Sequence, residues 1–509
     1  MGAERVTVEA RFEPHDRPGT ELVLSGLPDP VIRESRGRLS CALRANGLRI
    51  PPGVVHLNLV PAARRKVGGM LDLAIALGAA AACGHIEARW LAGSLFVGEL
   101  GIDGRLHPVP GGLAAAACAR ELGLERLFAP LATAREAAWI GELPCFGARS
   151  LAQVVAQLSG APGAPGALEP PAPKAGAPED GPPTPGDLSL DEVRGQAHAK
   201  RALAVAALGG HGLLLVGPPG AGKTMLARRL LALLPEPTRE ERIEITLALS
   251  AAGQWPGGLA HERPFRAPHH TTSFAGLVGG GSPPRPGEVS LAHHGLLFLD
   301  ELPEFPRDAL EALREPLEEG RVRLSRAGHR VELPASFQLA AAMNPCPCGH
   351  RGHPRVSCKC SPPVVERYRR RISGPLLDRI ELRVDLVPPS IEELLGDGRA
   401  PVPSESAPAE LRQAVLARAV LEGRERARAR QGELPNARLG VAHLEELVPL
   451  DRGSRRLLER ATRGRDLSAR AVQAVRRVAR SVADLAGAPA VEACHLAEAI
   501  ALRGALGPP

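Results

Sequence analysis

One glycine-rich run holds the residues with the clearest potential for chemistry. It reads GPPGAGKT, matches the pattern G-x-x-x-x-G-K-[ST], and lies between an apolar strand, GLLLV, and a helical run, MLARRLLALL. Its residues are Gly217, Pro218, Pro219, Gly220, Ala221, Gly222, Lys223 and Thr224. Backbone N–H groups in such a loop surround phosphates at a helix N-terminus, Lys223 neutralises the β and γ phosphates, and Thr224 offers its hydroxyl to Mg²⁺. The pattern therefore predicts a site for ATP and Mg²⁺ rather than an ordinary turn.

Acidic and amide side chains follow two further apolar runs. Asp300 and Glu301 end the run LLFLDE, and Asn344 ends the run FQLAAAMN. After a phosphate-binding loop, Asp300 can hold Mg²⁺ and Glu301 can polarise the water that attacks the γ-phosphate. Asn344 can orient that water, although an asparagine before proline is otherwise a common turn residue. These residues predict hydrolysis of the nucleotide and not binding alone.

Four of the nine cysteines are clustered in two C-x-C pairs, Cys346 with Cys348 and Cys358 with Cys360. Four thiolates can enclose a structural Zn²⁺ that would brace the loop after Asn344. Reduced thiols or a redox pair are the alternative, because C-x-C spacing is less diagnostic of zinc than C-x-x-C.

Two histidine doublets are weaker metal candidates. They are His269-His270 and His293-His294. Neighbouring side chains in an extended backbone point to opposite faces, so we expect the two rings of each doublet to lie apart.

The elements that must position these residues form three domains. Proline and glycine remove helix and strand options from residues 158–187 and again from residues 396–409, which we interpret as linkers. They separate an N-terminal α/β or α+β domain, residues 1–157, from residues 188–395, where the order strand, loop, helix and acidic strand predicts a P-loop αβα domain. Amphipathic runs predict a helical domain over residues 410–509.

Within the N-terminal domain the sequence alternates between strand and helix patterns. It predicts a strand at residues 54–60, a helix at residues 71–83, a hairpin turn at GIDGRL, a helix at residues 112–122 and a strand at LFAP.

Composition and charge exclude some classes of protein. Hydrophobic residues make up 44% and charged residues 23% of the 509, as in soluble globular proteins. No apolar run of about 18 residues is free of charge, and the first residues are too charged for a signal peptide, so we expect a cytoplasmic protein with no membrane partner.

The net charge of +7 is compatible with a polyanionic partner but does not require one. From Glu410 onward there are 18 arginines, no lysine and 12 acidic residues, a net charge of +6. A solvated helical face and a nucleic-acid surface explain that excess equally well.

Several long motifs occur together and in one order. GPPGAGKT, GLLFLDELPEF, AAMNPCPCG and RYRRRISGPLLDRIELRV resemble the magnesium-chelatase-like AAA+ ATPases of the ComM (YifB) family, over nearly the whole chain outside the longer linker. The resemblance implies a homo-oligomeric ring, a hexamer, in which Arg379 of the LLDRI element is an arginine finger for the neighbouring subunit's ATP. It also implies that Arg470 of the LSAR element is sensor 2 in a helical AAA+ lid.

The same resemblance implies a function. Members of the family are associated with DNA uptake and recombination and are thought to be helicases that drive branch migration. DNA and recombination proteins are therefore the expected partners.

The N-terminal domain resembles the proteolytic domain of Lon proteases, which has the ribosomal-protein S5 domain 2 type of fold. The Lon-type K-D-G-P-S-A-G segment reads KVGGMLD here, so Met70 stands where the nucleophilic serine would be. In the later G-G-L-K element, Ala114 replaces the catalytic lysine. Without a nucleophile or its base, peptide hydrolysis has no route.

Two segments of the central domain resemble inserts of related motors. RVRLSRAGHRVELPASF predicts a hairpin, and related motors carry a hairpin here that projects into the ring pore. Arg323, Arg326, His329 and Arg330 would then face a translocating strand, unless the hairpin is an ordinary solvent-exposed one. RPFRAPHHTTSFAGLVGGG resembles the helix 2 insert of this branch.

Three functions remain for comparison: a DNA motor, a magnesium-chelatase-type motor subunit and an ATP-dependent protease. Because Met70 and Ala114 replace the serine and the lysine of the Lon catalytic dyad, the sequence argues against a protease. Because chelatase motor subunits are expected to resemble only the central and helical portions, the Lon-like domain and the cysteine cluster favour the DNA motor.

Overall fold

The computed structural model of the chain describes two compact units. The residues that it describes are 3–27, 30–61, 66, 68–162, 164–168, 189–254, 257–281, 284–326, 329–353, 355–388, 409–465 and 467–504. The N-terminal unit comprises Met1–Ala177 and Leu249–Leu259, and the C-terminal unit comprises Pro178–Ala248 and Ala260–Pro509. None of the described helices is both long enough and apolar enough to cross a membrane.

Two three-stranded sheets form the framework of the N-terminal unit, with strand orders β1-β3-β2 and β4-β7-β8, beside the hairpin β5-β6. The strands are β1 (Thr7–Pro14), β2 (Thr20–Ser25), β3 (Gly53–Val60), β4 (Ser94–Phe96), β5 (Glu99–Leu100), β6 (Leu106–His107), β7 (Arg126–Pro130) and β8 (Cys145–Ala148). Alternate residues of β3 are buried, as expected when one face of a strand lies on the core. The strands predicted at 54–60 and LFAP are β3 and β7, and the predicted turn joins β5 to β6.

The helices of this unit are α1 (Pro30–Ala45), α2 (Asp72–Ala82), α3 (Ala88–Leu91), α4 (Gly112–Glu121), α5 (Leu131–Ala137) and α6 (Leu151–Ser159). Leu73, Ile75 and Leu77 of α2 are buried in the core. The alanines that complete α2 are small enough for it to pack closely against β1 and β3. The two predicted helices of this domain are α2 and α4.

The folded N-terminal unit continues beyond the start predicted for the longer linker. Leu158 is buried at the end of α6, and Leu168 forms a β-bridge with Cys145. The linker prediction used proline and glycine content, which does not register a single apolar side chain that completes a core. The rest of this linker from residue 169, and the shorter linker up to residue 408, lie outside the described residues.

A five-stranded parallel sheet forms the centre of the C-terminal unit, in the order β10-β13-β16-β9-β17. The strands are β9 (Leu213–Val216), β10 (Phe265–Arg266), β13 (Leu296–Leu299), β16 (Gln338–Met343) and β17 (Leu382–Asp385). Every residue of β9, β13 and β16 is buried, because helices cover both faces of a parallel sheet. The three sequence runs that end in predicted site residues are therefore neighbouring strands, and their carboxyl ends meet at one edge.

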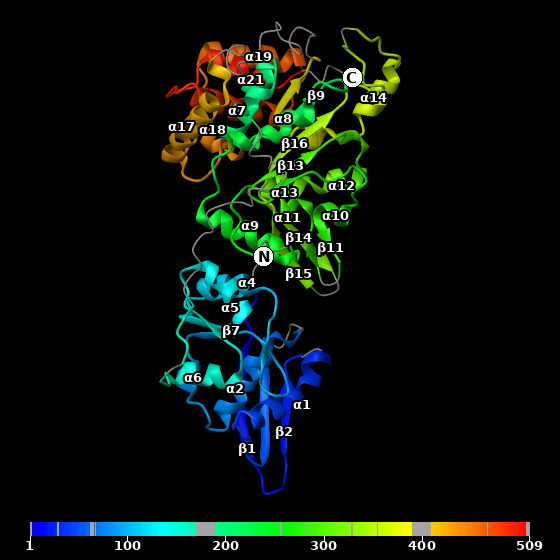
Figure 1. The fold of residues 1–509 in the computed structure, drawn as a ribbon. Helices are drawn as coiled ribbons and strands as arrows, with labels where there is room; N and C mark the ends of the chain where they lie inside the picture. Colours follow the sequence, from blue (N-terminus) through cyan, green and yellow to red (C-terminus); the bar gives the residue numbers. More distant parts are fainter. Residues whose placement is uncertain are drawn as a thin grey trace. The chain divides into compact units, whose positions relative to one another are not determined.

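The same part of the C-terminal unit also contains helices and two small hairpins (Figure 1). The helices are α7 (Ala197–Gly209), α8 (Lys223–Arg229), α9 (Arg239–Ala251), α10 (Phe274–Val278), α11 (Glu288–Leu291), α12 (Arg307–Ala312), α13 (Arg314–Glu319), α14 (Pro362–Arg369) and α15 (Gly374–Leu377). The hairpins are β11 (Gly279–Gly280) with β12 (Arg285–Pro286), and β14 (Arg321–Arg326) with β15 (His329–Pro334).

The C-terminal part of the same unit is helical, as predicted. It contains α17 (Gln413–Gln431), α18 (Val441–Leu447), α19 (Arg452–Arg465), α20 (Ala469–Leu485) and α21 (Ala493–Leu502), and α17 and α20 pack against α7. Buried polar side chains also tie these helices to the sheet: His211 lies between Glu381 and Ser481, and Arg477 donates to Glu381 at 3.1 Å. Satisfied polar groups of this kind favour one arrangement of helices and sheet.

Candidate active site

The glycine-rich loop forms a cradle at the carboxyl end of β9. Gly220 and Gly222 have φ angles of +79° and +85°, which L side chains rarely adopt, and α8 begins at Lys223. A cavity of about 450 Å³ lies over the loop. It is lined by Pro219, Gly220, Ala221, Gly222, Lys223, Thr224, Met225, Asp300, Glu301, Met343 and Asn344. Two further loop residues, Gly217 and Pro218, do not line the cavity, and their carbonyls accept hydrogen bonds from Lys223.

Lys223 and Asn344 meet in this cavity. The Lys223 ammonium donates to the carbonyls of Gly217 and Pro218, at 2.7 and 3.0 Å, and to Asn344 Oδ1 at 3.0 Å. Burial lowers the pKa of Lys223, and the negative charges of Asp300 and Glu301 oppose that shift. A cation and an amide thus lie side by side at the N-terminus of α8. The N-terminus of a helix also favours the binding of a phosphate.

Oxygen atoms that could serve as ligands of Mg²⁺ line the same cavity. The Thr224 hydroxyl donates to Asp300 Oδ2 at 2.8 Å, and the backbone N–H of Glu301 donates to Asp300 Oδ1 at 2.9 Å. A hydroxyl and a carboxylate are the hard ligands that Mg²⁺ binds together with phosphate oxygens and water, so these residues fit the ion.

Glu301 is held in an unusual backbone conformation. Its φ of +51° is left-handed, which costs a residue other than glycine about 1–3 kcal/mol. The conformation turns the chain directly after β13, and the Glu301 carboxylate lies 3.1 Å from His270 Nδ1. This contact is absent from the sequence predictions.

Both histidine doublets differ from expectation, since their rings lie together. The ring centroids are 4.1 Å apart in His269-His270 and 3.9 Å apart in His293-His294. His269 opens a turn closed by Thr272 N–H, and His294 has a φ of +57°, so neither doublet is extended. The prediction from strand geometry was wrong for this reason.

The second doublet forms a cluster with Glu244, but its hydrogen bonds disfavour a metal. His293 Nδ1 accepts the Ser336 N–H at 3.0 Å, so the ring proton is on Nε2 and is donated to Glu244 Oε2 at 2.9 Å. A metal at Nε2 would require that proton on Nδ1. The cluster therefore braces α9 against the loops that precede β13 and β16.

His270 is expected to hold Glu301 in position for the attacking water. Replacing His270 by alanine should lower kcat for ATP hydrolysis roughly tenfold with little change in KM, since it removes a contact to the carboxylate expected to polarise the attacking water. His270→Gln, which retains a donor, should recover part of the rate. His269→Ala is the matched control, because His269 bonds Thr271 instead. Equal rates for the two alanine variants would exclude this role.

The predicted arginine finger, Arg379, and the predicted sensor 2, Arg470, converge on one carboxylate outside the cavity lining. Arg379 donates to Glu318 and, at 2.6 Å, to the Pro375 carbonyl, while Arg470 Nη2 lies 3.5 Å from the same Glu318. The Arg379 side chain is only 9% exposed, whereas that of Arg470 is 57% exposed. The structure thus brings them together at α13, and Glu318 is a residue that motif reading did not single out.

The hairpin β14-β15 forms where predicted. Its register pairs Arg326 with His329 and Ser325 with Arg330. Arg323 lies among the carboxylates of Glu315, Glu319 and Glu332, at 3.6, 2.6 and 3.6 Å, which is evidence against it as a free cation. The side chains of Arg326, His329 and Arg330 lie outside the described residues.

The four clustered cysteines come together as a four-sulfur site, with their Sγ atoms all within 4.8 Å of one another. Cys346, Cys348 and Cys358 have Sγ–Sγ distances of 3.4 to 3.6 Å. Four sulfurs at 2.3 Å from a central Zn²⁺ would be about 3.8 Å apart, so the site fits tetrahedral zinc. Backbone N–H donors of His350 and Lys359 lower the pKa of Cys348 to about 6, which favours the thiolate.

The cysteine loop also touches the cradle. A Cβ on Gly349 would lie 2.7 Å from Cδ of Pro219 and 4.0 Å from Cγ of Asn344. The loop therefore packs directly on the phosphate-binding loop.

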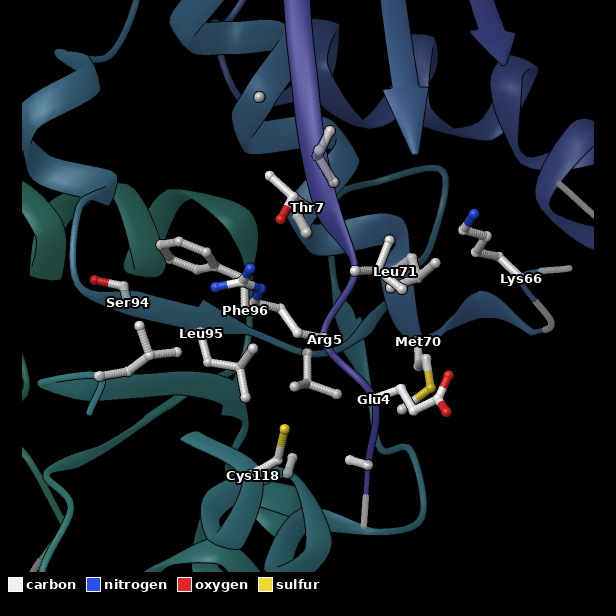
Figure 2. Close-up of a pocket in the computed structure, with 18 of the residues that line it drawn as sticks. Glu4, Arg5, Thr7, Lys66, Met70, Leu71, Ser94, Leu95, Phe96 and Cys118 are labelled. Carbon is white, nitrogen blue, oxygen red and sulfur yellow. The ribbon is translucent and has the colours of Figure 1, made fainter. Parts of the chain in front are cut away.

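In the N-terminal unit, Met70 and Lys66 line a pocket of about 440 Å³ (Figure 2). Lys66 donates to the carbonyls of Gly26, at 3.0 Å, and Pro61. Its ammonium is thus a structural donor, and the thioether at position 70 is not a nucleophile for peptides.

The parallel sheet and the cradle define the class of P-loop nucleotide hydrolases. Residues 189–394 match the family described as magnesium chelatase, subunit ChlI, residues 9–133 match subunit ChlI of Mg-chelatase, and residues 411–503 match the ChlI C-terminal family. The chain belongs to the ComM/YifB family of magnesium-chelatase-like proteins, and this membership implies ATPase activity.

Two of the relatives that align with nearly the whole chain illustrate this membership. The chain is 39% identical to the uncharacterized protein YifB of Salmonella typhimurium, over 99% of this chain and 95% of the relative. It is also 39% identical to the competence protein ComM of Haemophilus influenzae, over 98% of this chain and 95% of the relative. A shorter similarity, 29% over 184 residues, joins 31% of the chain to 33% of Lon protease 2 of Bacillus subtilis.

One expectation is corrected by these comparisons. Chelatase subunits were expected to resemble only the central and helical portions, yet residues 9–133 match a family described as a chelatase subunit. The N-terminal domain therefore does not argue against a chelatase-type motor.

Proposed function

We propose that this protein is a ring-shaped ATP-driven motor that remodels DNA during recombination or competence. The observation that carries the ATPase part is the single cavity where Lys223, Thr224, Asp300, Glu301 and Asn344 meet. Lys223 and Thr224 bind the phosphates and Mg²⁺ with Asp300, Glu301 polarises water, and Asn344 orients it.

The same proposal completes the site between subunits of a homo-hexamer. Arg379 and Arg470 do not line the cavity of their own chain, and they share Glu318. Arg379 would exchange this carboxylate for the phosphates of the neighbour's ATP, and Arg470 would leave it to act as sensor 2. In this proposal Glu318 binds the two arginines until a nucleotide binds to the neighbouring subunit.

DNA is the proposed substrate because a full-length relative is named a competence protein. Recombination proteins are proposed partners on the same ground, and the proposed location is the cytoplasm.

The test compares ATPase rates with and without forked and four-way DNA, together with strand displacement by wild type and Lys223→Ala. A rate indifferent to DNA, with strand displacement unchanged in Lys223→Ala, would remove the helicase proposal.

A magnesium-chelatase-type motor acting on a protein partner is the second candidate. It is favoured by the descriptions of the three matching families. An ATPase stimulated by no DNA structure, in a protein that still forms rings with ATP, would support it over the DNA motor. The Lon-like unit with Met70 in place of serine offers no protease route.

We propose that Cys346, Cys348, Cys358 and Cys360 hold a structural Zn²⁺, which fixes the loop packed on Pro219. Elemental analysis of the wild type is expected to find about one zinc per chain. Cys348→Ser is expected to remove that zinc and to lower the ATPase rate roughly 10- to 100-fold, because the loop would no longer hold the cradle in place. The isolated, exposed Cys494 provides the control Cys494→Ser, which should change neither quantity. Full activity of metal-free wild type would contradict the bracing role.

A further inference from the structure

Helix α19 carries most of the positive charge of the helical C-terminal part. Its sequence, RGSRRLLERATRGR, has six arginines and one glutamate, so it alone contributes +5. Arg452, Arg456, Arg460 and Arg463 are all exposed and fall within about 80° of one another around the helix at 100° per residue. Glu459 lies on the same face and is the single acid of the helix.

These four arginines differ from the others in the C-terminal part. Outside α19, arginines such as Arg418, Arg428 and Arg430 bond to Glu422, Glu433 and Asp484. The same is true of most of their counterparts: Arg424, Arg426, Arg438, Arg470, Arg476, Arg477, Arg480 and Arg503 also have hydrogen-bond or ion-pair partners.

Among the described residues, the side chains of the four arginines of the α19 stripe form no hydrogen bond or ion pair with one another or with their neighbours. A solvated face would be expected to pair its charges locally, as α17 does. The concentration of unpaired cations on one face therefore favours an external polyanion.

The geometry of α19 fits a phosphate backbone. From Arg452 to Arg463 the helix rises about 16 Å. One strand of duplex DNA presents a phosphate about every 3.4 Å along its axis, so the stripe can face roughly four of them. Arginine binds phosphate oxygens through two N–H groups at once.

An anionic membrane surface fits less well. Membrane-binding helices insert an apolar face between lipid headgroups. The apolar face of α19 is already occupied: Leu458 is buried in the core of the unit, and Leu457 packs against that core. Only the charged face is available to a partner.

We propose that the Arg452, Arg456, Arg460 and Arg463 face of α19 binds the phosphate backbone of duplex DNA. This inference rests on the proposed DNA function and assigns it a contact surface separate from the ATP site. The contact is independent of base sequence, because phosphates carry no sequence information.

The test measures the affinity of the full chain for a labelled duplex over a range of salt concentrations. Each phosphate contact contributes about 0.9 to the slope of log affinity against log salt. The double variant Arg456→Gln with Arg460→Gln should therefore make the slope about 2 units less steep. Glutamine has nearly the helix propensity of arginine, so the helix and the DNA-free ATPase rate should be retained.

The matched control is Arg418→Gln with Arg428→Gln, which removes the same charge from paired arginines of α17. Its slope should equal that of wild type. A slope equal to that of wild type in the α19 variant, or an equal decrease of the slope in the α19 and α17 variants, would overturn this inference. Either result would leave the motor proposal standing. A wild type that binds no duplex would overturn both. Loss of binding to phosphatidylglycerol vesicles, with DNA binding intact, would assign the face to a membrane instead.

Discussion

Replacing Glu301 by glutamine is expected to slow ATP hydrolysis by roughly 10²- to 10⁴-fold, which is the range contributed by a positioned general base. Glutamine has the same shape but cannot accept a proton from water. The cradle residues Lys223 and Thr224 are untouched, so ATP affinity should stay within a few-fold of wild type. Phosphate release gives the rate, and a fluorescent ATP analogue gives the affinity.

Lys223→Ala should give a different outcome from Glu301→Gln. Lys223 interacts with the phosphates in both the bound and reacting states, so its loss should weaken nucleotide binding as well as hydrolysis. Glu304→Gln is the matched control, because Glu304 pairs with Arg371 and does not line the cavity. If Glu301→Gln retains the wild-type rate, another group activates the water.

The sequence predicts the cradle well because its residues are consecutive. Gly217 to Thr224 form one local loop, and Asp300 and Asn344 each follow an apolar strand. Parallel strands bring such ends to one edge of the sheet, so a local pattern was enough to place them together. The order of the strands, with β9 between β16 and β17, depends on long-range pairing and did not follow from these patterns.

Other parts of the site depend on backbone turns that sequence patterns do not register. His270 reaches Glu301 because a turn follows His269 and because Glu301 has a positive φ. Glu318 lies on a helix with ordinary charge spacing, and only the tertiary fold brings it to Arg379. The doublet His269-His270 was the available sequence signal for this contact. We interpreted it with the geometry of an extended strand, which does not apply to a turn.

Arg379→Ala is expected to lower the ATPase rate roughly 10³- to 10⁵-fold, the range observed when an arginine finger is removed. Arg379 is tied to Glu318 and the Pro375 carbonyl and does not line its own cavity, so its effect should require a neighbour. Arg370→Ala is the control, since Arg370 is exposed and, at the C-terminal end of α14, pairs with Glu366 of that helix.

Mixing two inactive variants distinguishes action in trans from a local structural effect. Arg379→Ala retains an intact cradle, and Lys223→Ala retains an intact finger. In a mixed ring, some interfaces combine the intact cradle of the first with the intact finger of the second, so part of the activity should return. Activity that stays at the level of the separate variants, although the two chains co-assemble, would mean that Arg379 serves its own subunit or only its fold.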